Sequence, residues 1–378
     1  MAAITAHFLS KEIDMVEKTE VRISDEFELS DEKLMGNANR WRRFGVPVPA
    51  GGSKKEDGSP DYGLFGPGSI VWKVALHPSN IVFQSVAQWG LQLMYKPVTA
   101  GVRDQDPLAR KVRQGKLTAF DYFERLQRNS GIHAPMWFGD TATAEGIWKH
   151  LYRIHSHVEG GVIDVGEPGL GGFSATGSRE VMWAALTEMV GMLWVYEHFA
   201  WHGDTPPSRL SDEERDQYIS ESAAYLRLVG SPEDEIPHTM AEADALFDKY
   251  QDLFKKSETA DIMPDTGQHF AQLMHEQIKN NWHPTQQKVI DLLNEFFNEP
   301  MPAVIASYPE KIQLWGAGWG EAQRAEGVKK LAGSQKRIRQ MQESPETFQR
   351  ALDVFWGPDG TELINVAREL DEKVRVAL

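Results

Sequence analysis

The sequence predicts an all-α fold, and three observations lead to this prediction. Apolar residues recur with the spacing of a helix through most of the chain, and no stretch keeps the period-two alternation of a strand. Two segments begin with a Ser/Thr-x-x-Asp/Glu capping box, at Ser211/Glu214 and at Thr239/Glu242. No segment repeats at a fixed period, so the helices are expected to form one domain and not a repeat array. We therefore expect a single multi-helix domain of about a dozen helices.

The first part of the chain is expected to be an arm that packs on the body. Residues 1–66 combine a charged opening, a helix near residues 31–44 and a loop rich in Gly, Pro and charge. The body follows as residues 67–378. It opens with two helical patterns that are separated by His77-Pro78 and closed by Pro97.

The middle of the chain predicts a helix that is buried on nearly all sides. A bend framed by Gly and Pro leads to a short helix at residues 108–113, and an amphipathic helix follows it. Residues 161–178 are rich in glycine but lack the lysine of a phosphate-binding loop, so we expect a covering loop. Residues 179–202 are apolar almost all round, which indicates a central buried helix. Further helices are expected at residues 267–281, 286–298, 334–342, 345–356 and 361–376.

Composition and charge exclude several classes of protein. The chain has 378 residues, 41% of them hydrophobic and 25% charged, which is ordinary for a globular protein with a large core. A net charge of −15 argues against nucleic acid as a partner, because neutralising phosphates needs a basic surface. The chain has no cysteine, so disulfides, thiolate metal sites and thiolate-ligated heme are excluded.

Two segments bear on location. Residues 179–202 could be mistaken for a membrane span, but Glu188, Glu197 and His198 make insertion costly, so no transmembrane segment is expected. The first residues lack a basic region followed by an apolar core, so neither a secretory signal nor a twin-arginine leader is expected. A cytoplasmic location is therefore expected, while the oligomeric state and a peripheral membrane contact stay open.

Residues 138–161 predict one capped helix with a histidine on its apolar side. Asp140 and Thr141 are N-cap residue types, and Gly160 and Gly161 can end a helix in the left-handed conformation. At about 100° per residue, His155 shares one stripe with Ile147, Trp148, Leu151, Ile154 and Val158. A neutral imidazole there needs a hydrogen bond or a metal. Two interpretations stay open, a hydrogen-bonded core histidine and a metal ligand, in particular the axial ligand of a heme.

Other polar groups are weaker candidates. The zinc-protease order HExxH is absent, and neither Glu197-His198 nor His275-Glu276 has the spacing of a di-iron carboxylate site. Glu188 is either a functional carboxylate or a hydrogen-bonded structural one. Arg125 and Arg128, three apart on one helix, could pair with heme propionates or form a solvated helix face. The remaining histidines are expected at the surface or in loops, namely His7, His77, His133, His150, His202, His238, His269 and His283.

Six motifs in a fixed order carry a resemblance to a known family. They are GPGSIVWKVALHP at residues 66–78, PVTAGVRD at 97–104, RLQRN at 125–129, FGDTATAE at 138–145, RIHSHVEG at 153–160 and WAALTE at 183–188. Their order and spacing resemble the heme b oxygenase superfamily that includes latex clearing protein, a rubber oxygenase, and the ER-bound oxygenase of mycophenolic acid biosynthesis. The resemblance covers roughly residues 60–300.

The resemblance implies a globin-like helical core that holds heme b. It implies that His155, in the RIH motif, is the proximal iron ligand. The family motif Arg-x-x-Lys/Arg-Thr falls on Arg125, Arg128 and Asn129, and the family threonine of the buried helix falls on Thr187. Arg125 and Arg128 are thus the expected partners of the heme, and Arg128, Asn129 and Thr187 are the expected catalytic residues.

The chain departs from the family pattern around the expected distal pocket. Arg128 stands where latex clearing protein has a lysine that can ligate iron, and a guanidinium is a poor ligand because it stays protonated. Asn129 replaces the threonine of the motif, and Gln105 and Asp106 replace a His-Ser pair. We therefore expect an open or water-occupied distal position, and these departures weaken the expectation of polyisoprene as substrate.

The resemblance also implies a reaction. Family members cleave a carbon–carbon double bond of an isoprenoid chain with O2 to give carbonyl products, so we expect O2 and a small hydrophobic, isoprenoid or other olefinic substrate as partners. Two alternatives keep the heme: a hydroxylase or peroxygenase of a small hydrophobic metabolite, and a non-catalytic heme-binding sensor or carrier. A heme-free helical scaffold is the third alternative.

Overall fold

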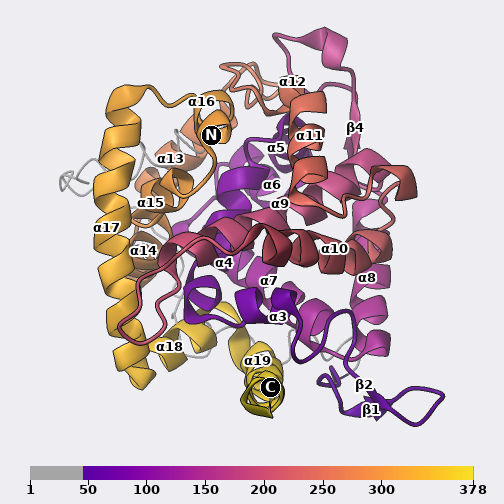
Figure 1. The fold of residues 1–378 in the computed structure, drawn as a ribbon. Coiled ribbons are helices and arrows are strands. Elements are labelled where there is room, and N and C mark those ends of the chain that lie inside the picture. The colour runs from indigo at the N-terminus through magenta and orange to yellow at the C-terminus, as the bar shows by residue number, and fades with distance from the viewer. Residues whose placement is uncertain (1–45, 378) are drawn as a thin grey trace.

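Helices build most of the structure, a computed structural model that describes residues 46–377 (Figure 1). The predicted all-α class is confirmed. Within these residues the strands form two short antiparallel pairs, β1 (Ser53–Lys54) with β2 (Pro60–Asp61) and β3 (Glu159–Gly160) with β4 (Phe173–Ser174). The first helices are α3 (Ile70–Ala75), α4 (Pro78–Gln92), α5 (Lys96–Gln105), α6 (Pro107–Arg113), α7 (Ala119–Phe138), α8 (Thr141–His155), α9 (Ser178–Phe199) and α10 (Asp212–Leu228). The later helices are α11 (Met240–Lys249), α12 (Gln251–Phe254), α13 (Phe270–Asn280), α14 (Gln287–Leu293), α15 (Met301–Ala306), α16 (Glu310–Trp315), α17 (Glu321–Glu343), α18 (Pro345–Phe355) and α19 (Gly357–Ala377).

Side chains cap several helices where the sequence predicts it. The capping box of α10 is complete, because Ser211 accepts from the Glu214 N–H and Glu214 accepts from the Ser211 N–H. At α11, Thr239 accepts a hydrogen bond from the backbone of Glu242. Asp140 caps the first turn of α8 in the same way. The starts of these helices are therefore determined by local hydrogen bonds.

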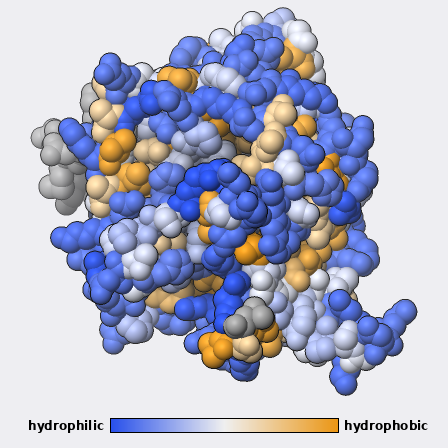
Figure 2. All heavy atoms as spheres, in the orientation of Figure 1, coloured by the Kyte–Doolittle hydropathy of each residue, from blue (hydrophilic) through white to orange (hydrophobic). Residues whose placement is uncertain are grey.

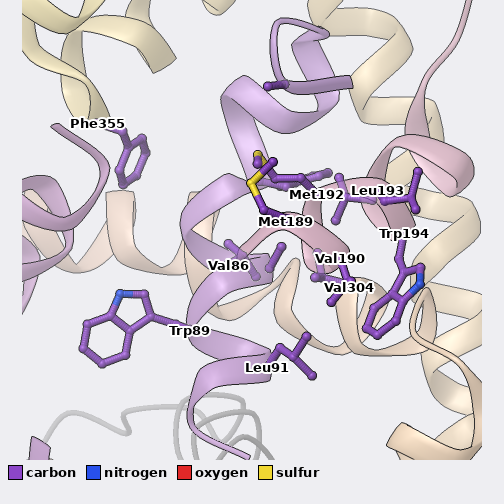
Figure 3. Packing of buried hydrophobic residues seen from close by; sticks show 14 of the residues in the cluster. Val86, Trp89, Leu91, Met189, Val190, Met192, Leu193, Trp194, Val304 and Phe355 are labelled. Atoms are coloured by element: carbon purple, nitrogen blue, oxygen red, sulfur yellow. The ribbon is translucent and has the colours of Figure 1, made fainter. Parts of the chain in front are cut away.

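The core is centred on α4 and α9, which pack against each other more extensively than any other two described elements. α9 is buried on nearly all sides, as its sequence predicts. Figure 3 shows Val86 of α4 and Met189 of α9 in this interface, with Val304 of α15 and Phe355 of α18 nearby. α15, α17 and α18 cover α4, while α3, α5 and α10 contact α9. The side chains of the central pair therefore lie in a dry interior.

The helix that carries His155 is shorter than predicted. α8 ends at His155, with Ser156 as C-cap, and the chain turns at once into β3. Gly160 does not end the helix. It pairs with Phe173 of β4, and a Cβ at Gly160 would lie 2.5 Å from the Phe173 ring, so this glycine is needed for close packing.

A second difference concerns Pro97 and the segment after it. Pro97 does not close α4, which ends at Gln92, but lies in the first turn of α5, where its missing N–H costs nothing. The predicted bend is therefore mostly helix α5. Arg103 of this helix is 0% exposed. Its guanidinium donates to Asp104 and to the backbone carbonyls of residues 162, 163 and 260. Arg103 thus holds the glycine-rich loop and the segment around Ala260 against α5.

The C-terminal helices agree with the sequence in place more than in length. The helix predicted at residues 334–342 is the last part of α17, and the one predicted at 286–298 is α14 followed by a π-helical turn at Asn294–Asn298. The helix expected near residues 31–44 lies outside the described residues. The division into an arm of residues 1–66 and a body of 67–378 stays a prediction.

The surface shown in Figure 2 is mainly hydrophilic, with hydrophobic side chains in scattered groups. This pattern is ordinary for a globular protein. Between residues 46 and 377, no helix combines the length and the apolar character that crossing a membrane requires.

Candidate functional site

His155 lies at the end of a helical hairpin made by α7 and α8, which pack on each other and are separated by Gly139 and Asp140. The predicted apolar stripe of α8 is only partly buried. Ile147 is buried, Trp148, Leu151 and His155 are half-buried, and Ile154 is 48% exposed. Within this stripe, only Ile147 is therefore buried in the core. The part of α8 that carries His155 leaves apolar side chains without full cover.

The imidazole of His155 has no partner within residues 46–377, where it makes no hydrogen bond and no ion pair. Surrounding protein atoms exclude water, which lowers the pKa of His155 to about 4, and the positive charge of Arg125 lowers it further. The negative charge of Glu188 acts in the opposite direction. At neutral pH the ring is therefore uncharged, with at least one nitrogen lone pair available. This is the state in which histidine binds a metal.

Arg125 lies on α7, and its positive charge is close enough to His155 to lower the pKa of that imidazole. Its Nε donates to Asp106 at 2.8 Å, and its guanidinium stacks over the Trp89 ring, 5.2 Å from the centroid. Its side chain is 26% exposed. A half-buried arginine with part of its fork still available could pair with a carboxylate of a bound group.

Arg128 is placed differently from Arg125. Its guanidinium forms an ion pair of 2.8 Å with Glu124, one turn earlier on α7, and its side chain is 47% exposed. The described contacts therefore do not bring Arg128 together with His155. The roles assigned to Arg128 stay predictions.

Asn129 and Thr187 are less exposed than Arg128. Asn129 is half-buried on α7, and its Nδ2 donates to Gln88 Oε1 at 2.6 Å. Thr187 is fully buried in α9, and its hydroxyl donates to the carbonyl of Trp183 at 2.6 Å. The Thr187 hydroxyl proton is thus already engaged, so this side chain can offer only its lone pairs.

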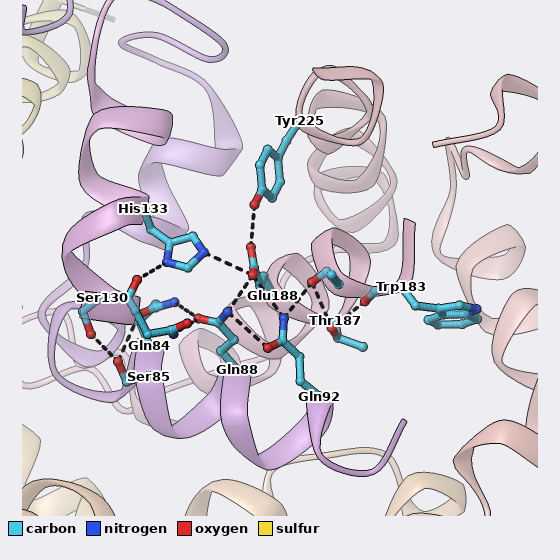
Figure 4. Close-up of polar contacts among 12 residues, drawn as sticks. Gln84, Ser85, Gln88, Gln92, Ser130, His133, Trp183, Thr187, Glu188 and Tyr225 are labelled. Carbon is cyan, nitrogen blue, oxygen red and sulfur yellow. Dashed lines mark hydrogen bonds and ion pairs between the residues drawn. The ribbon is translucent and has the colours of Figure 1, made fainter. Parts of the chain in front are cut away.

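Glu188 is the centre of a buried polar network (Figure 4). It is 5% exposed, and Gln88, Gln92, His133 and Tyr225 all contact its carboxylate at 2.6–3.1 Å. The sequence left open whether Glu188 is a functional carboxylate or a hydrogen-bonded structural one. The contacts of Glu188 are those of a hydrogen-bonded carboxylate. These hydrogen-bond donors replace the water molecules that the carboxylate loses when it is buried.

The prediction of His133 as a surface or loop residue is wrong. His133 lies inside α7 and is 3% exposed, with Nε2 3.1 Å from Glu188 Oε1 and Nδ1 2.6 Å from the Asn129 carbonyl. His77 is also buried, as the N-cap of α4. The signal for His133 was available, since it follows Leu126 by seven residues and so lies on the apolar face of α7.

A cavity and the placement of metal-ligating side chains concern other parts of the described chain. A cavity of about 280 Å³ is lined by side chains of α9, α10 and α11 with Pro309, and none of the predicted site residues lines it. Across the described part of the chain, no cluster of three or more His, Cys, Asp or Glu could hold a metal ion. A heme needs less, because its porphyrin supplies four ligands to the iron and the protein supplies one or two axial ligands.

The fold and these side chains define a helical protein in which a neutral, unpartnered histidine lies near a buried carboxylate network. The family model described as "ER-bound oxygenase mpaB/B'/Rubber oxygenase, catalytic domain" matches residues 72–317, which is more than half of the chain. The chain belongs to this family of oxygenases, and the resemblance seen in the motifs is confirmed. No curated protein and no solved structure matches the chain.

Proposed function

We propose that this protein is a heme b-dependent oxygenase that uses O2 to cleave a carbon–carbon double bond of a hydrophobic, isoprenoid or other olefinic substrate. Membership of an oxygenase family supports the class of reaction. One observation carries the cofactor proposal: His155 is uncharged and unpartnered beside half-buried apolar side chains. A core histidine without a ligand would ordinarily find a hydrogen bond.

The residues present fit a heme. His155 would hold the iron, and Arg125 would pair with a propionate while it keeps its contact with Asp106. Trp148 and Leu151, half-buried on the same helix, would contact the macrocycle. When bound, heme would supply the binding and activation of O2.

Three side chains of this chain would act on O2 and substrate. Asn129 would hold the oxygen or the substrate through its amide, and Thr187 would offer lone pairs because its proton is engaged. Arg128 would need to leave Glu124 to reach the site. Apolar walls would exclude water and admit a hydrophobic olefin.

The proposed reaction balances without a further reagent. Both atoms of O2 enter the products, so that the double bond is replaced by two carbonyl groups. No electron donor and no net proton is required. Hydroxylation, the main alternative, inserts one oxygen atom and needs a reductant or a peroxide.

The first test is the cofactor. We expect purified protein from heme-replete expression to show a Soret band, and we expect His155→Ala to lose it while its helical circular dichroism is retained. His157→Ala is the matched control, because His157 is an exposed imidazole two residues further on. A wild-type protein without heme, or a His155→Ala variant that keeps heme and activity unchanged, would contradict the proposal.

The second test is the fate of the oxygen atoms. With ¹⁸O₂ and a panel of terpenoid olefins, cleavage places one labelled atom in each carbonyl product. A single labelled hydroxyl group would identify a hydroxylase. A stable oxygen complex with no consumption of any olefin would identify a sensor or carrier.

A further inference from the structure

A chain of hydrogen-bonded amides connects Glu188 in the core to Asn129 on α7. Gln88 of α4 is the link, because its Nε2 donates to Glu188 Oε1 and its Oε1 accepts from Asn129 Nδ2, both at 2.6 Å (Figure 4 shows Gln88 with Glu188). Gln88 is 3% exposed and Glu188 is 5% exposed. Water therefore does not compete with the bond between Gln88 and Glu188.

Glu188 accepts hydrogen bonds from every side. Its Oε1 faces Gln88 Nε2, Gln92 Nε2 at 3.1 Å and His133 Nε2 at 3.1 Å, and its Oε2 accepts from the Tyr225 hydroxyl at 2.8 Å. Carboxylate oxygens accept hydrogen bonds. Gln88, Gln92 and Tyr225 therefore each present a donor to Glu188.

His133 is the neighbour of Glu188 on α7. Its Nδ1 lies 2.6 Å from the backbone carbonyl oxygen of Asn129. This oxygen can only accept a hydrogen bond, so Nδ1 carries a proton. Its Nε2 faces the carboxylate. The distance of 3.1 Å between Nε2 and Oε1 requires one proton between these two atoms, so His133 and Glu188 form a hydrogen-bonded pair.

The carboxylate determines which way the Gln88 amide points. The amide nitrogen has to face Glu188, so the amide oxygen faces the other way, where it accepts from Gln84 Nε2 at 2.7 Å and from Asn129 Nδ2. An amide turned by 180° would place two oxygens together and two donors together. Asn129 is therefore also held with its nitrogen toward Gln88.

Asn129 then has a defined free side. Within residues 46–377 its side chain makes no other hydrogen bond, so Oδ1 and the second N–H of Nδ2 stay available. Asn129 is half-buried and one turn from Arg125, whose charge reaches His155. Its free side is thus on the part of α7 that the proposed function assigns to O2 and substrate.

We propose that Glu188 is a positioning residue that acts through Gln88 to hold the Asn129 amide in one orientation toward the O2 and substrate site. This inference rests on the proposed function. Preorganised dipoles act more strongly than dipoles that have to turn during the reaction. Glu188 itself need not touch the substrate.

Carbon monoxide on the reduced heme protein is the probe for the test, read by the infrared stretch of the ligand. We expect one narrow band in the wild type and a shifted band in Asn129→Leu. We expect Glu188→Gln and Gln88→Met to give a second or broadened band near the position of Asn129→Leu, because the Asn129 amide can then turn. Tyr225→Phe is the matched control, since Tyr225 also donates to Glu188 but makes no hydrogen bond with Gln88 or Asn129. It should keep the single wild-type band.

Two results on the heme protein would overturn the inference. One is a single wild-type band in both Glu188→Gln and Gln88→Met while Asn129→Leu shifts it. The other is an unshifted band in Asn129→Leu. Gln88→Met keeps the test valid if Glu188→Gln does not fold.

A readout without heme separates this inference from the proposed function. In heme-free protein, the unfolding free energies of Gln88→Met and Asn129→Leu should be non-additive, and the non-additivity should vanish in a Glu188→Gln background. A coupling that is absent, or that is unchanged by Glu188→Gln, overturns the inference. Absence of heme from the wild type, by contrast, contradicts the proposed function and leaves this measurement to decide the amide link.

Discussion

At the scale of single residues, the burial of Glu188 determines what its neighbours must be. A carboxylate that is 5% exposed needs donors in place of water, and α4, α7 and α10 each provide them. The donor from α10 is the hydroxyl of Tyr225, a fully buried group. Burial, with Glu188 nearby, raises the pKa of Tyr225 well above its ordinary value, so the phenol keeps its proton and donates.

Removing this donor should destabilise the fold. We expect Tyr225→Phe to lower the free energy of unfolding by about 1–3 kcal/mol, because Oε2 of Glu188 is left without its hydrogen bond in the core. Urea denaturation followed by circular dichroism measures the change. Tyr152→Phe is the control, since Tyr152 is 49% exposed, and it should change the stability little. Equal stabilities of the two variants would contradict the role given to Tyr225.

The residue scale also marks what the sequence could predict. Glu188 was identified as a buried carboxylate because it lies in a helix that is apolar all round. Its partners could not be identified, since Gln88, His133 and Tyr225 come from three other helices whose packing is a tertiary property. The roles of His155, Arg125, Arg128, Asn129 and Thr187 stay predictions that rest on the family.

At the scale of elements, α4 begins with an unusual cap. The N-cap is His77, whose Nδ1 accepts a hydrogen bond from the Ser79 N–H at 3.1 Å, while its Nε2 lies 3.2 Å from the Trp201 carbonyl. Nε2 therefore carries the proton and the ring is neutral. Burial, with the charges of His202 and Arg368, lowers the pKa of His77 to about 4.

This cap should make stability depend on pH. The ordinary pKa of 6.5 applies to the unfolded chain, so the unfolded chain takes up a proton first as the pH falls. The stabilisation is complete above pH 6.5 and is lost between pH 6.5 and about 4. A difference of this size corresponds to about 3 kcal/mol. Unfolding measured from pH 7.5 to 4.5 should show a smaller loss of stability in His77→Asn, which keeps a capping acceptor but does not titrate.

Other histidines titrate in the same range, so the comparison needs a matched variant. His238→Asn removes an exposed imidazole whose side chain makes no described hydrogen bond. Its stability should follow the wild type across the pH range. A constant difference between wild type and His77→Asn at every pH would show that His77 is not held neutral.

Elements were more predictable than their ends. The positions of α7, α9 and α10 follow from periodicity and capping, which are local properties. The end of α8 at His155 was missed because β3 pairs with β4 across a loop, and sequence-local signals do not report such pairing. The π-helical turn Asn294–Asn298 was missed because such turns are rare and occur mostly within α-helices, whose apolar pattern they share.

At the scale of the whole molecule, the packing of α4 and α9 leaves different amounts of space at two glycines. A Cβ at Gly191 of α9 would make ordinary contacts of 3.5–3.6 Å with Ala87. A Cβ at Gly90 of α4 would lie 2.7 Å from the Tyr308 hydroxyl, which donates to the Ala87 carbonyl. A side chain at Gly90 would therefore be crowded, whereas one at Gly191 would have ordinary space.

Matched alanine substitutions should separate these two sites. Gly191→Ala should be neutral or stabilise by about 0.5–1 kcal/mol, because alanine favours the helix and fits. Gly90→Ala should destabilise by about 1–3 kcal/mol, because Tyr308 has to move and loses its bond to Ala87. Thermal unfolding of both variants measures the difference. A stabilising Gly90→Ala would show that this part of the core is not closely packed.

Arg103 has a consequence for which side chains of the loop after β3 can change. The guanidinium holds the loop after β3 and the segment near Ala260 through main-chain carbonyls, which every amino acid possesses. The side chain of the half-buried Val162 can therefore be exchanged while this hydrogen bond is kept, whereas Ile163 and Ala260 are buried and are also held by packing. The course of this loop thus depends on one arginine side chain together with the packing of Ile163 against Phe173.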